Sequence, residues 1–308
     1  MRAVRIIGGG VAVEDVPEPA GDGVLLEVVA SSICGTDVGM VAMGATGFTL
    51  GHEFAGTVDG VAYAVEPTVY CGRCEECLAG RTQRCSGEHG NLGIFLDGGL
   101  ADRVVVSPEA LVPLPRGLDP ADACLVEPTA VAWHGMRLAA LQPGERVAVV
   151  GGGSIGLLAA AVTRSLGHDV DLDARYPHQL EAGERLGAGR PSGLYDVVVD
   201  AAGSESSVER CAELARPGGR VVLLGVYYDR VPVPGVVSLV KELSYISAMA
   251  YGREGGDREV ERAAQLLASD PQIAATLVTH RFALDDAAEA FRVAADRRSG
   301  ARKVVLLP

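Results

Sequence analysis

The sequence lacks the surplus of basic residues that binding to nucleic acids or to anionic membranes requires. Lysine and arginine total 27 against 40 aspartates and glutamates, and the formal net charge is −13. Proteins that bind phosphate-rich surfaces concentrate lysine and arginine on one face. The composition therefore argues against both functions and favours chemistry on small molecules.

Long apolar segments and a secretory signal are also missing. The longest uncharged stretch, residues 147–163, is slightly too short to span a membrane and contains four glycines. The first ten residues show no charged region followed by an unbroken apolar run and a cleavage site with small residues. We therefore expect an intracellular, cytoplasmic protein.

The 308 residues are enough for about two domains with full cores. Up to about residue 118, short strand-like runs are broken by glycine and proline, which is typical of a β-barrel-like domain. From about residue 120, strands and helices alternate, which is typical of βαβ units around a parallel sheet. We expect strands at 24–29, 104–106, 146–150, 170–175, 196–200 and 220–225, and helices at 154–166, 179–186 and 206–215.

The C-terminal part predicts two helices, 259–268 and 284–295, and then a strand at 303–307 that rejoins the first domain. The expected division is a first domain of residues 1–118 and 278–308 and a second domain of residues 119–277.

Four of the seven cysteines stand close together, as Cys71, Cys74, Cys77 and Cys85. Four thiolates on one short loop can surround a tetrahedral Zn²⁺ and leave no coordination position open, which is typical of a structural zinc site. Two disulfides, four free thiols and an iron–sulfur cluster are the alternatives. An intracellular setting disfavours disulfides, and the remaining motifs favour zinc.

A glycine-rich turn predicts a dinucleotide site. Gly151-Gly152-Gly153-Ser154-Ile155-Gly156 matches Gly-x-Gly-x-x-Gly directly after an expected strand and at the start of an expected helix. The first glycine allows the tight turn, the second lets the backbone approach a pyrophosphate, and the third lets the helix pack on the strand. Gly8-Gly9-Gly10 also follows an apolar run, but no helix follows it, so we interpret it as a hairpin turn.

The residues after the second strand of this domain bear on the choice of nucleotide. An acid there binds the ribose 2′-hydroxyl of NAD, whereas an arginine accommodates the 2′-phosphate of NADP. Asp171 and Asp173 lie near the expected spacing, and Arg175 follows them. The spacing alone permits both cofactors.

Taken together and in this order, the motifs resemble those of the zinc-containing medium-chain alcohol and polyol dehydrogenases, in the branch of sorbitol and threonine dehydrogenases. The resemblance covers nearly the whole chain. The shared motifs are Cys34-Gly35-Thr36-Asp37, Gly51-His52-Glu53, the four-cysteine loop, Asp97-Gly98-Gly99, Glu127-Pro128, the glycine-rich turn, Pro217-Gly218-Gly219-Arg220 and Lys303-Val304-Val305. The resemblance implies an α/β protein. A GroES-like β-barrel domain would carry a catalytic zinc, and a Rossmann domain with a doubly wound parallel sheet would bind the cofactor in the cleft against the first domain.

The resemblance also implies roles for single residues. Cys34 and His52 would bind the catalytic zinc, with Glu53 or Glu127 as the third protein ligand and one position open for water or the substrate oxygen. Thr36 would relay the proton, and Asp37 would orient His52 through its other ring nitrogen.

For the cofactor, the family's Leu-Gly-Ala motif aligns with residues 186–188. This register places Ala174 where NAD-dependent members carry their acid, and Arg175 follows. That pattern resembles the members that prefer NADP(H). The alternative is that Arg175 is a solvated charge and Asp173 binds the ribose. Further cofactor contacts are implied at Leu224, Gly225 and Val226.

The chain departs from the family in four places, one of which is the short segment between Glu53 and Cys71. The loop between Cys34 and His52 is trimmed, and a strand and a helix are missing after Gly187, so we expect five strands instead of six in the Rossmann sheet. Gly39 stands where many members carry a histidine that continues the proton relay.

The sequence thus predicts a zinc-dependent oxidoreductase that transfers a hydride between NADP(H), or NAD(H), and a secondary alcohol or ketone. A polyol, sugar or cyclitol is the expected substrate, and a homodimer or homotetramer the expected assembly. The alternatives are a zinc-free reductase of the quinone or enoyl type and an inactive nucleotide-binding sensor on the same fold.

Overall fold

The computed structural model describes residues 1–87, 89–228 and 230–308, and it divides into two units. Unit 1 consists of Met1–Glu127 and Gly252–Pro308, and unit 2 of Pro128–Tyr251. Residues 252–277 therefore pack with unit 1, whereas the sequence places them in the second domain. The boundaries of the functional domains stay a prediction.

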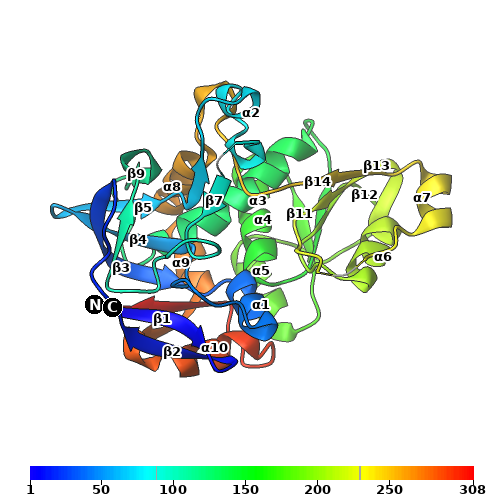
Figure 1. Ribbon diagram of the computed structural model, residues 1–308. Helices are drawn as coiled ribbons and strands as arrows, with labels where there is room; N and C mark the ends of the chain where they lie inside the picture. Colours follow the sequence, from blue (N-terminus) through cyan, green and yellow to red (C-terminus); the bar gives the residue numbers. More distant parts are fainter. Residues whose placement is uncertain (88, 229) are drawn as a thin grey trace. The chain divides into compact units, whose positions relative to one another are not determined.

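Unit 1 is built on a seven-stranded sheet in the order β15-β16-β3-β4-β5-β9, with β8 paired to β3. Strands β3, β4, β5 and β9 of this sheet are labelled in Figure 1. These strands are β3 (Val24–Ser32), β4 (Glu53–Val58), β5 (Val61–Val65), β8 (Arg103–Val106), β9 (Leu111–Pro113), β15 (Val278–Ala283) and β16 (Lys303–Leu307). Only β15 and β16 run parallel to each other among these pairs. Because β16 pairs with β3, the predicted return of the C-terminal strand to the first unit is confirmed.

Two hairpins and several helices complete unit 1. The hairpins are β1 (Arg2–Ile7) with β2 (Gly10–Asp15), and β6 (Thr68–Tyr70) with β7 (His89–Asn91). The helices are α1 (Gly35–Met43), α2 (Glu75–Leu78), α8 (Glu259–Ser269), α9 (Pro271–Leu277) and α10 (Ala287–Ala295), and single 3₁₀ turns lie at Thr82–Arg84, Pro108–Ala110, Ala123–Leu125, Glu254–Gly256 and Leu284–Asp286. Gly8 and Gly9 have φ values of 58° and 82° in the turn of the first hairpin, so that interpretation is confirmed.

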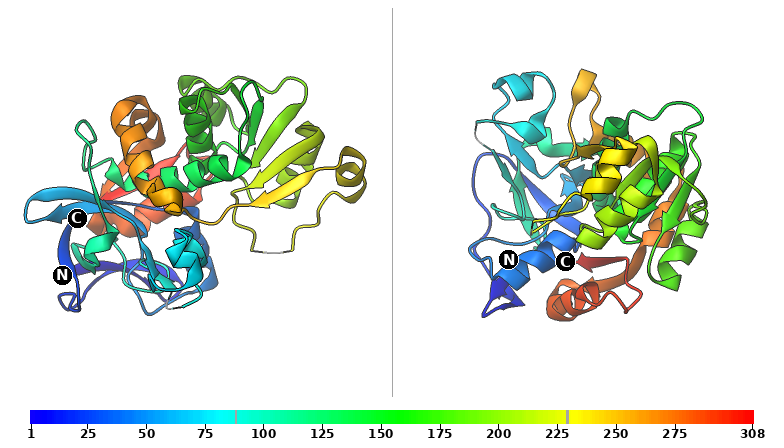
Figure 2. Two further views of the ribbon diagram at one scale, coloured as in Figure 1. Left: turned by 90° about the horizontal axis from the view of Figure 1, so that it is seen from above. Right: turned by 90° about the vertical axis from the view of Figure 1, so that its right-hand side faces the viewer.

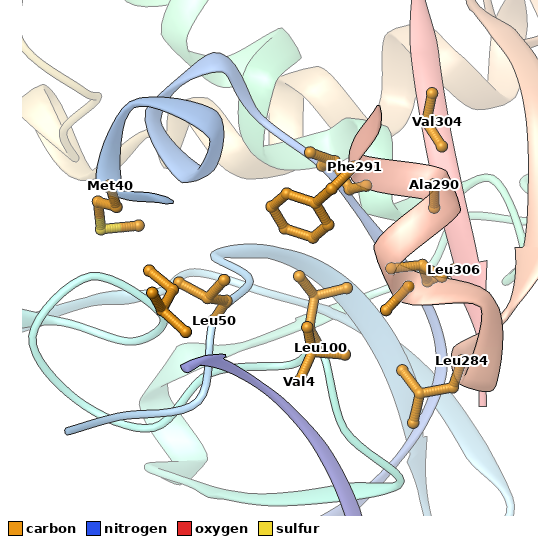
Figure 3. Close-up of a cluster of buried hydrophobic side chains, with 12 residues drawn as sticks. Val4, Met40, Leu50, Leu100, Leu284, Ala290, Phe291, Val304 and Leu306 are labelled. Atoms are coloured by element: carbon orange, nitrogen blue, oxygen red, sulfur yellow. The ribbon is translucent and has the colours of Figure 1, made fainter. Parts of the chain in front are cut away.

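The largest apolar core described in unit 1 joins segments from both ends of the chain. In α10, Ala287, Ala290 and Phe291 follow the spacing of one helix face and are buried. They pack against side chains of β1, β16, α1 and the loops at Leu50 and Leu100 (Figure 3). The core members labelled there are Val4, Met40, Leu50, Leu100, Leu284, Ala290, Phe291, Val304 and Leu306. The two chain ends accordingly lie near each other in unit 1 (Figure 2).

Unit 2 is a parallel sheet with helices on both faces. Its strand order is β11-β10-β12-β13-β14, and every adjacent pair is parallel. The strands are β10 (Val147–Val150), β11 (Val170–Asp173), β12 (Tyr195–Asp200), β13 (Ala215–Leu223) and β14 (Ser244–Ser247), and the helices are α3 (Val126–Ala139), which begins at the boundary, α4 (Ser154–Ser165), α5 (Pro177–Arg185), α6 (Glu205–Leu214) and α7 (Gly235–Lys241). Helices α4 and α5 cover one face and α6 the other (Figure 1).

The central strands β10 and β12 are buried on both faces, which explains their unbroken valine-rich runs. The predicted reduction to five strands is confirmed. Beside β11, an isolated parallel bridge joins Asp171 to Gly189. Within the described part of the chain, no helix is both long and apolar enough to cross a membrane.

Candidate active site

Cys34, His52 and Glu53 come together at the ends of two neighbouring strands of unit 1. Antiparallel pairing of β3 with β4 places Ser32 opposite Glu53, so the residues that follow β3 and precede β4 meet at one end of the sheet. One ligand atom from each of the three residues lies within 4.8 Å of the others. His52 and Glu53 are buried, and Cys34 is half-buried.

Helix α1 fixes the position of Asp37 beside this group. The helix begins directly after Cys34, whose backbone N–H donates to Asp37 Oδ2 at 2.8 Å, and it ends at Gly44 with φ 69°. The other oxygen of Asp37 lies 3.4 Å from Nδ1 of His52. Nε2 is therefore the ring nitrogen left for a metal, as in metal sites where a carboxylate orients the histidine.

The charge around His52 fits a cation. Burial disfavours the charged imidazole, but Asp37 and Cys34 outweigh burial and hold the pKa of His52 well above its ordinary value. Asp37 Oδ1 and His52 Nδ1 are buried without a hydrogen bond among the residues described. A thiolate, an imidazole and a carboxylate in one partly enclosed place form a ligand set of the catalytic zinc type.

Glu53 has strong partners of its own. Lys303 Nζ lies 2.8 Å from Oε1 and 2.7 Å from Oε2, and the hydroxyl of Ser32 donates to Oε2. Lys303 is only 2% exposed. Burial lowers the pKa of Lys303, but the nearby Glu53 and Cys34 outweigh it, so that its pKa is raised and the ammonium is retained.

Two more of the predicted site residues lie in unit 1. Glu127 is buried in the first turn of α3, and the group of Cys34, His52 and Glu53 does not include it. Thr36 lies half-buried in the first turn of α1. The roles of Glu127 as a ligand and of Thr36 as a relay stay predictions.

The four cysteines of the predicted structural site converge as a zinc site requires. One sulfur from each lies within 4.8 Å of the others, and all four are free thiols. Cys71 Sγ lies 4.0 Å from Cys77 Sγ, close to the separation of about 3.8 Å that tetrahedral Zn–S bonds of about 2.3 Å produce. The backbone amides of Cys77 and Ser86 lower the pKa of Cys74 to about 5, which favours the thiolate that a metal binds.

This loop also holds the segment by which the chain returns to unit 1. Arg253 N donates to the carbonyl oxygen of Gly80 at 2.7 Å, and Glu259 accepts from Gly252 N at 2.6 Å. A Cβ on Gly252 would lie 2.9 Å from Gly80 O and from Gln83 Oε1, so a side chain there does not fit. The returning segment is therefore packed directly on the loop.

A buried carboxylate strengthens this attachment. Glu66, whose side chain is 1% exposed, accepts from Arg253 Nη2 at 2.8 Å and from Arg258 Nη2 at 2.7 Å. The guanidinium of Arg253 lies 5.0 Å from the ring centroid of Tyr70, which directly precedes Cys71. These contacts tie the cysteine loop, residues 71–85, to residues 252–258, so we expect that disordering the loop also loosens that segment.

In unit 2, the glycine-rich turn has the backbone that a dinucleotide site needs. Gly151 has φ 111°, and a Cβ on Gly156 would lie 1.8 Å from Gly151 O. A Cβ on Gly153 would meet nothing within 4 Å, so this backbone faces open space where a phosphate can approach. Helix α4 begins at Ser154, and the N–H groups of Ser154 and Ile155 in its first turn suit an anion.

The residues that follow β11 differ in their partners. Asp173 Oδ2 accepts from Arg210 Nε at 2.6 Å, so this acid already has a cationic partner. Arg175 is exposed, and its side chain makes no hydrogen bond or ion pair with the residues that are described. Ala174 packs beside the turn, since a Cβ on Gly152 would lie 2.7 Å from its Cβ.

Sequence reasoning missed Asp200, which supports the predicted contacts at residues 224–226. Leu224 N and Gly225 N both donate to the Asp200 carbonyl oxygen at 2.9 Å, and Val226 is exposed. The Asp200 carboxylate accepts from Ala202 N at 2.8 Å and from Ser207 Oγ at 2.9 Å. An acid at the end of an otherwise apolar strand is the signal that identifies such a residue.

Comparisons with known proteins agree with this geometry. Residues 20–116 match the alcohol dehydrogenase GroES-like domain family, and residues 159–269 match the zinc-binding dehydrogenase family. D-xylulose reductase A of Aspergillus oryzae is 31% identical over 308 residues, which cover 87% of this chain and 85% of that protein. The chain belongs to the zinc-binding medium-chain dehydrogenases/reductases.

Solved structures of similar proteins extend over the whole chain. A protein of Sinorhizobium meliloti 1021 that is described as a zinc-binding dehydrogenase, solved bound to NADP, is similar to this chain with a TM-score of 0.88 at 31% identity. The match covers 100% of this chain and 99% of that chain. Galactitol-1-phosphate dehydrogenase of Escherichia coli has a TM-score of 0.90 at 28% identity, with full coverage of both chains. The predicted α/β class, a GroES-like domain with a Rossmann domain, is confirmed for this medium-chain dehydrogenase/reductase.

Proposed function

We propose that this chain is a cytoplasmic, zinc-dependent dehydrogenase that interconverts a secondary alcohol and its ketone with NADP(H). The observation that carries the proposal is the meeting of Cys34, His52 and Glu53, with Asp37 behind the histidine. The names of two relatives, D-xylulose reductase A and galactitol-1-phosphate dehydrogenase, support a polyol, sugar or related cyclic polyalcohol as the substrate class.

A zinc ion held by Cys34, His52 and one glutamate would supply a Lewis acid for the substrate oxygen. The chain supplies the rest of the polar machinery. Asp37 Oδ1 lies 3.4 Å from Nδ1 of His52, which leaves Nε2 for the metal, and Thr36 relays the proton of the substrate hydroxyl. With Gly39 in place of a histidine, we expect that proton to leave from Thr36 to water without a second side chain in the relay.

Substitution of Thr36 tests the relay. We expect Thr36→Val to lower kcat about a hundredfold, because proton transfer by a positioned group contributes on the order of 10² or more. Thr36→Ser keeps the hydroxyl and should retain most of the activity. Steady-state kinetics on pentitols, hexitols and cyclitols with NADP⁺ measures both, and equal losses in the two variants would show that the hydroxyl is not used.

Two features of unit 2 support NADP(H) over NAD(H). Arg175 presents an exposed guanidinium just after β11, and Asp173 is engaged by Arg210. A dinucleotide bound at the turn of residues 151–156 would supply the hydride acceptor or donor, and Arg175 would bind its 2′-phosphate.

Substitution of Arg175 tests this preference. We expect Arg175→Ser to raise the Kd of NADPH at least about tenfold, since a hydrogen bond to a charged group contributes about 1.5–3 kcal/mol, and to leave that of NADH unchanged. Arg185→Ser, which removes another exposed arginine at the end of α5, is the matched control. Fluorescence titration measures the Kd of NADPH and of NADH for each of these two variants, and wild type is the reference. An equal loss for both nucleotides, or a large loss of NADH binding in Asp173→Asn, would instead assign the ribose to Asp173.

We also propose that the protein is a homodimer or homotetramer. Strand β14 is one of the two edges of the sheet of unit 2. The helix α7, which precedes it, exposes Val236, Leu239 and Val240, each more than 70% exposed. An open edge beside exposed apolar side chains suits pairing with a second copy. Analytical ultracentrifugation tests this assembly.

A further inference from the structure

The hydroxyl of Tyr227 reaches from the segment after β13 to the carboxylate at the end of β12. We propose that Tyr227 is a positioning residue that holds the backbone of residues 224–226 for the nicotinamide half of the cofactor. The inference deepens the proposed function and rests on it, since it requires a dinucleotide at the glycine-rich turn. It names the part of the cofactor that this segment receives and the side chain that keeps the segment in place.

The first argument is the direction in which a dinucleotide runs across the sheet of unit 2. In folds of this kind, the pyrophosphate lies at the N-terminus of the first helix and the adenosine ribose at the end of the second strand. Here these elements are α4 and β11. Strand β11 lies on one side of β10, whereas β12 and then β13 lie on the other side, all parallel. The nicotinamide half therefore extends toward the carboxyl ends of β12 and β13.

The second argument is that one carboxylate joins the turns that follow these two strands. Asp200, the last residue of β12, is 0% exposed. Its Oδ1 accepts from Ala202 N at 2.8 Å and from Gly203 N at 3.2 Å. Its Oδ2 accepts from the hydroxyls of Ser207 at 2.9 Å and of Tyr227 at 2.5 Å. Hydrogen bonds to a carboxylate are about twice as strong as those between neutral groups, so the tyrosine is held firmly.

The third argument is that the two turns pack backbone against backbone. A Cβ on Gly203 would lie 2.6 Å from Val226 O, and a Cβ on Gly225 would lie 2.4 Å from Gly203 N. The glycine-rich turn belongs to the same assembly, because a Cβ on Gly151 would lie 3.0 Å from Ala202 N. The backbone that receives the nicotinamide half thus keeps its place only while the end of its segment is held.

The side chain of Tyr227 is suited to hold that end. It is half-buried, and burial, followed by the hydrogen bond to Asp200, raises the pKa of its hydroxyl. The hydroxyl therefore keeps its proton and remains a donor at neutral and alkaline pH. The next residue, Tyr228, is 58% exposed, so the chain offers two adjacent tyrosines in different environments.

These tyrosines supply the variants for the test, and the cofactor supplies the probes. Tyr227→Phe removes only the hydroxyl that reaches Asp200, and Tyr228→Phe removes the exposed hydroxyl as the matched control. The probes are NADPH, NADH and 2′-phospho-ADP-ribose. The last of these carries the adenosine half, the diphosphate and a ribose, but no nicotinamide. Isothermal titration calorimetry measures the Kd of each probe for each protein.

We expect Tyr227→Phe to raise the Kd of NADPH about tenfold, because the lost hydrogen bond has a charged acceptor. The Kd of NADH should rise by the same factor, since the nicotinamide half is common to both nucleotides. The Kd of 2′-phospho-ADP-ribose should change less than about twofold, as should all three constants in Tyr228→Phe. A general loosening of unit 2 would weaken all three probes, so the difference between NADPH and 2′-phospho-ADP-ribose measures positioning.

Two results overturn the inference: equal losses for NADPH and 2′-phospho-ADP-ribose in Tyr227→Phe, or the same NADPH constant in Tyr227→Phe and Tyr228→Phe. Should Tyr227→Phe fold poorly, the same comparison decides with Ser207→Ala, which removes another donor from the same carboxylate. Its control is Ser206→Ala, because Ser206 Oγ lies 3.2 Å from Ser204 Oγ instead. Wild-type protein that binds none of the three probes would overturn the proposed function itself, which makes the two failures distinguishable.

Discussion

Replacement of Cys34 by alanine is expected to lower the zinc content from two atoms per chain to one and to reduce turnover about a thousandfold or more. Cys34 is the half-buried thiol of the group with His52 and Glu53. Zinc acting on a substrate oxygen supplies several kcal/mol of transition-state stabilisation, and each 1.36 kcal/mol is a factor of ten in rate. Elemental analysis and steady-state kinetics on the same preparation measure both quantities.

Two controls for this substitution lie in unit 2: the binding of NADPH and the replacement of another cysteine. The glycine-rich turn lies in unit 2, so NADPH should bind Cys34→Ala with unchanged affinity. Cys211→Ala removes a buried thiol that packs in the sheet core of unit 2 and should keep both zinc atoms. Two zinc atoms retained in Cys34→Ala would contradict the assignment of the site.

Replacement of Cys74 by serine is expected to remove the other zinc and to loosen a segment more than 170 positions away in the sequence. Structural zinc sites contribute folding free energy directly, so we expect the Tm to fall. Because Gly80 O accepts from Arg253 N, the loss of order should reach residues 252–258 and raise their amide exchange at least about tenfold. Hydrogen exchange followed by mass spectrometry measures this.

Two references make that result specific to the metal. Glu76→Gln breaks the ion pair of Glu76 with Arg81 in the same loop but removes no sulfur ligand, so it should leave the exchange of residues 252–258 unchanged. A peptide spanning β10 and α4 reports on unit 2 and should also be unaffected. Uniform exchange throughout Cys74→Ser would indicate global unfolding, and no change at residues 252–258 would contradict the coupling.

The sequence predicted those parts of the fold that depend on local patterns and ordered motifs. The strand from Val147 and the helix from Ser154 were readable because apolar runs of strand and helix length flank the glycines. The five-stranded sheet followed from missing residues after Gly187. The hairpin at Gly8 and Gly9 followed from the absence of a helix after it.

The remaining features depend on partners far apart in the chain. Lys303 belonged to a recognised motif, but its contact with Glu53 spans 250 positions and arises only from the order of β16, β3 and β4. The ion pairs of Asp173 with Arg210 and of Glu66 with Arg253 also join residues far apart in the chain, so the hydrophobic periodicity of the sequence does not predict them. The local indication of the contact between Lys303 and Glu53 was a lysine at the start of an apolar strand, because a buried charge requires a partner.

The most direct test of the central claim is a zinc titration of the metal-depleted protein, followed by its turnover of a polyol panel with NADP⁺. Four thiolates should capture the first equivalent, so we predict no turnover up to one zinc per chain and a linear rise between one and two. Turnover that is complete with the first equivalent, or that does not depend on zinc, would contradict a catalytic metal at Cys34 and His52 and would favour a zinc-free reductase on the same fold.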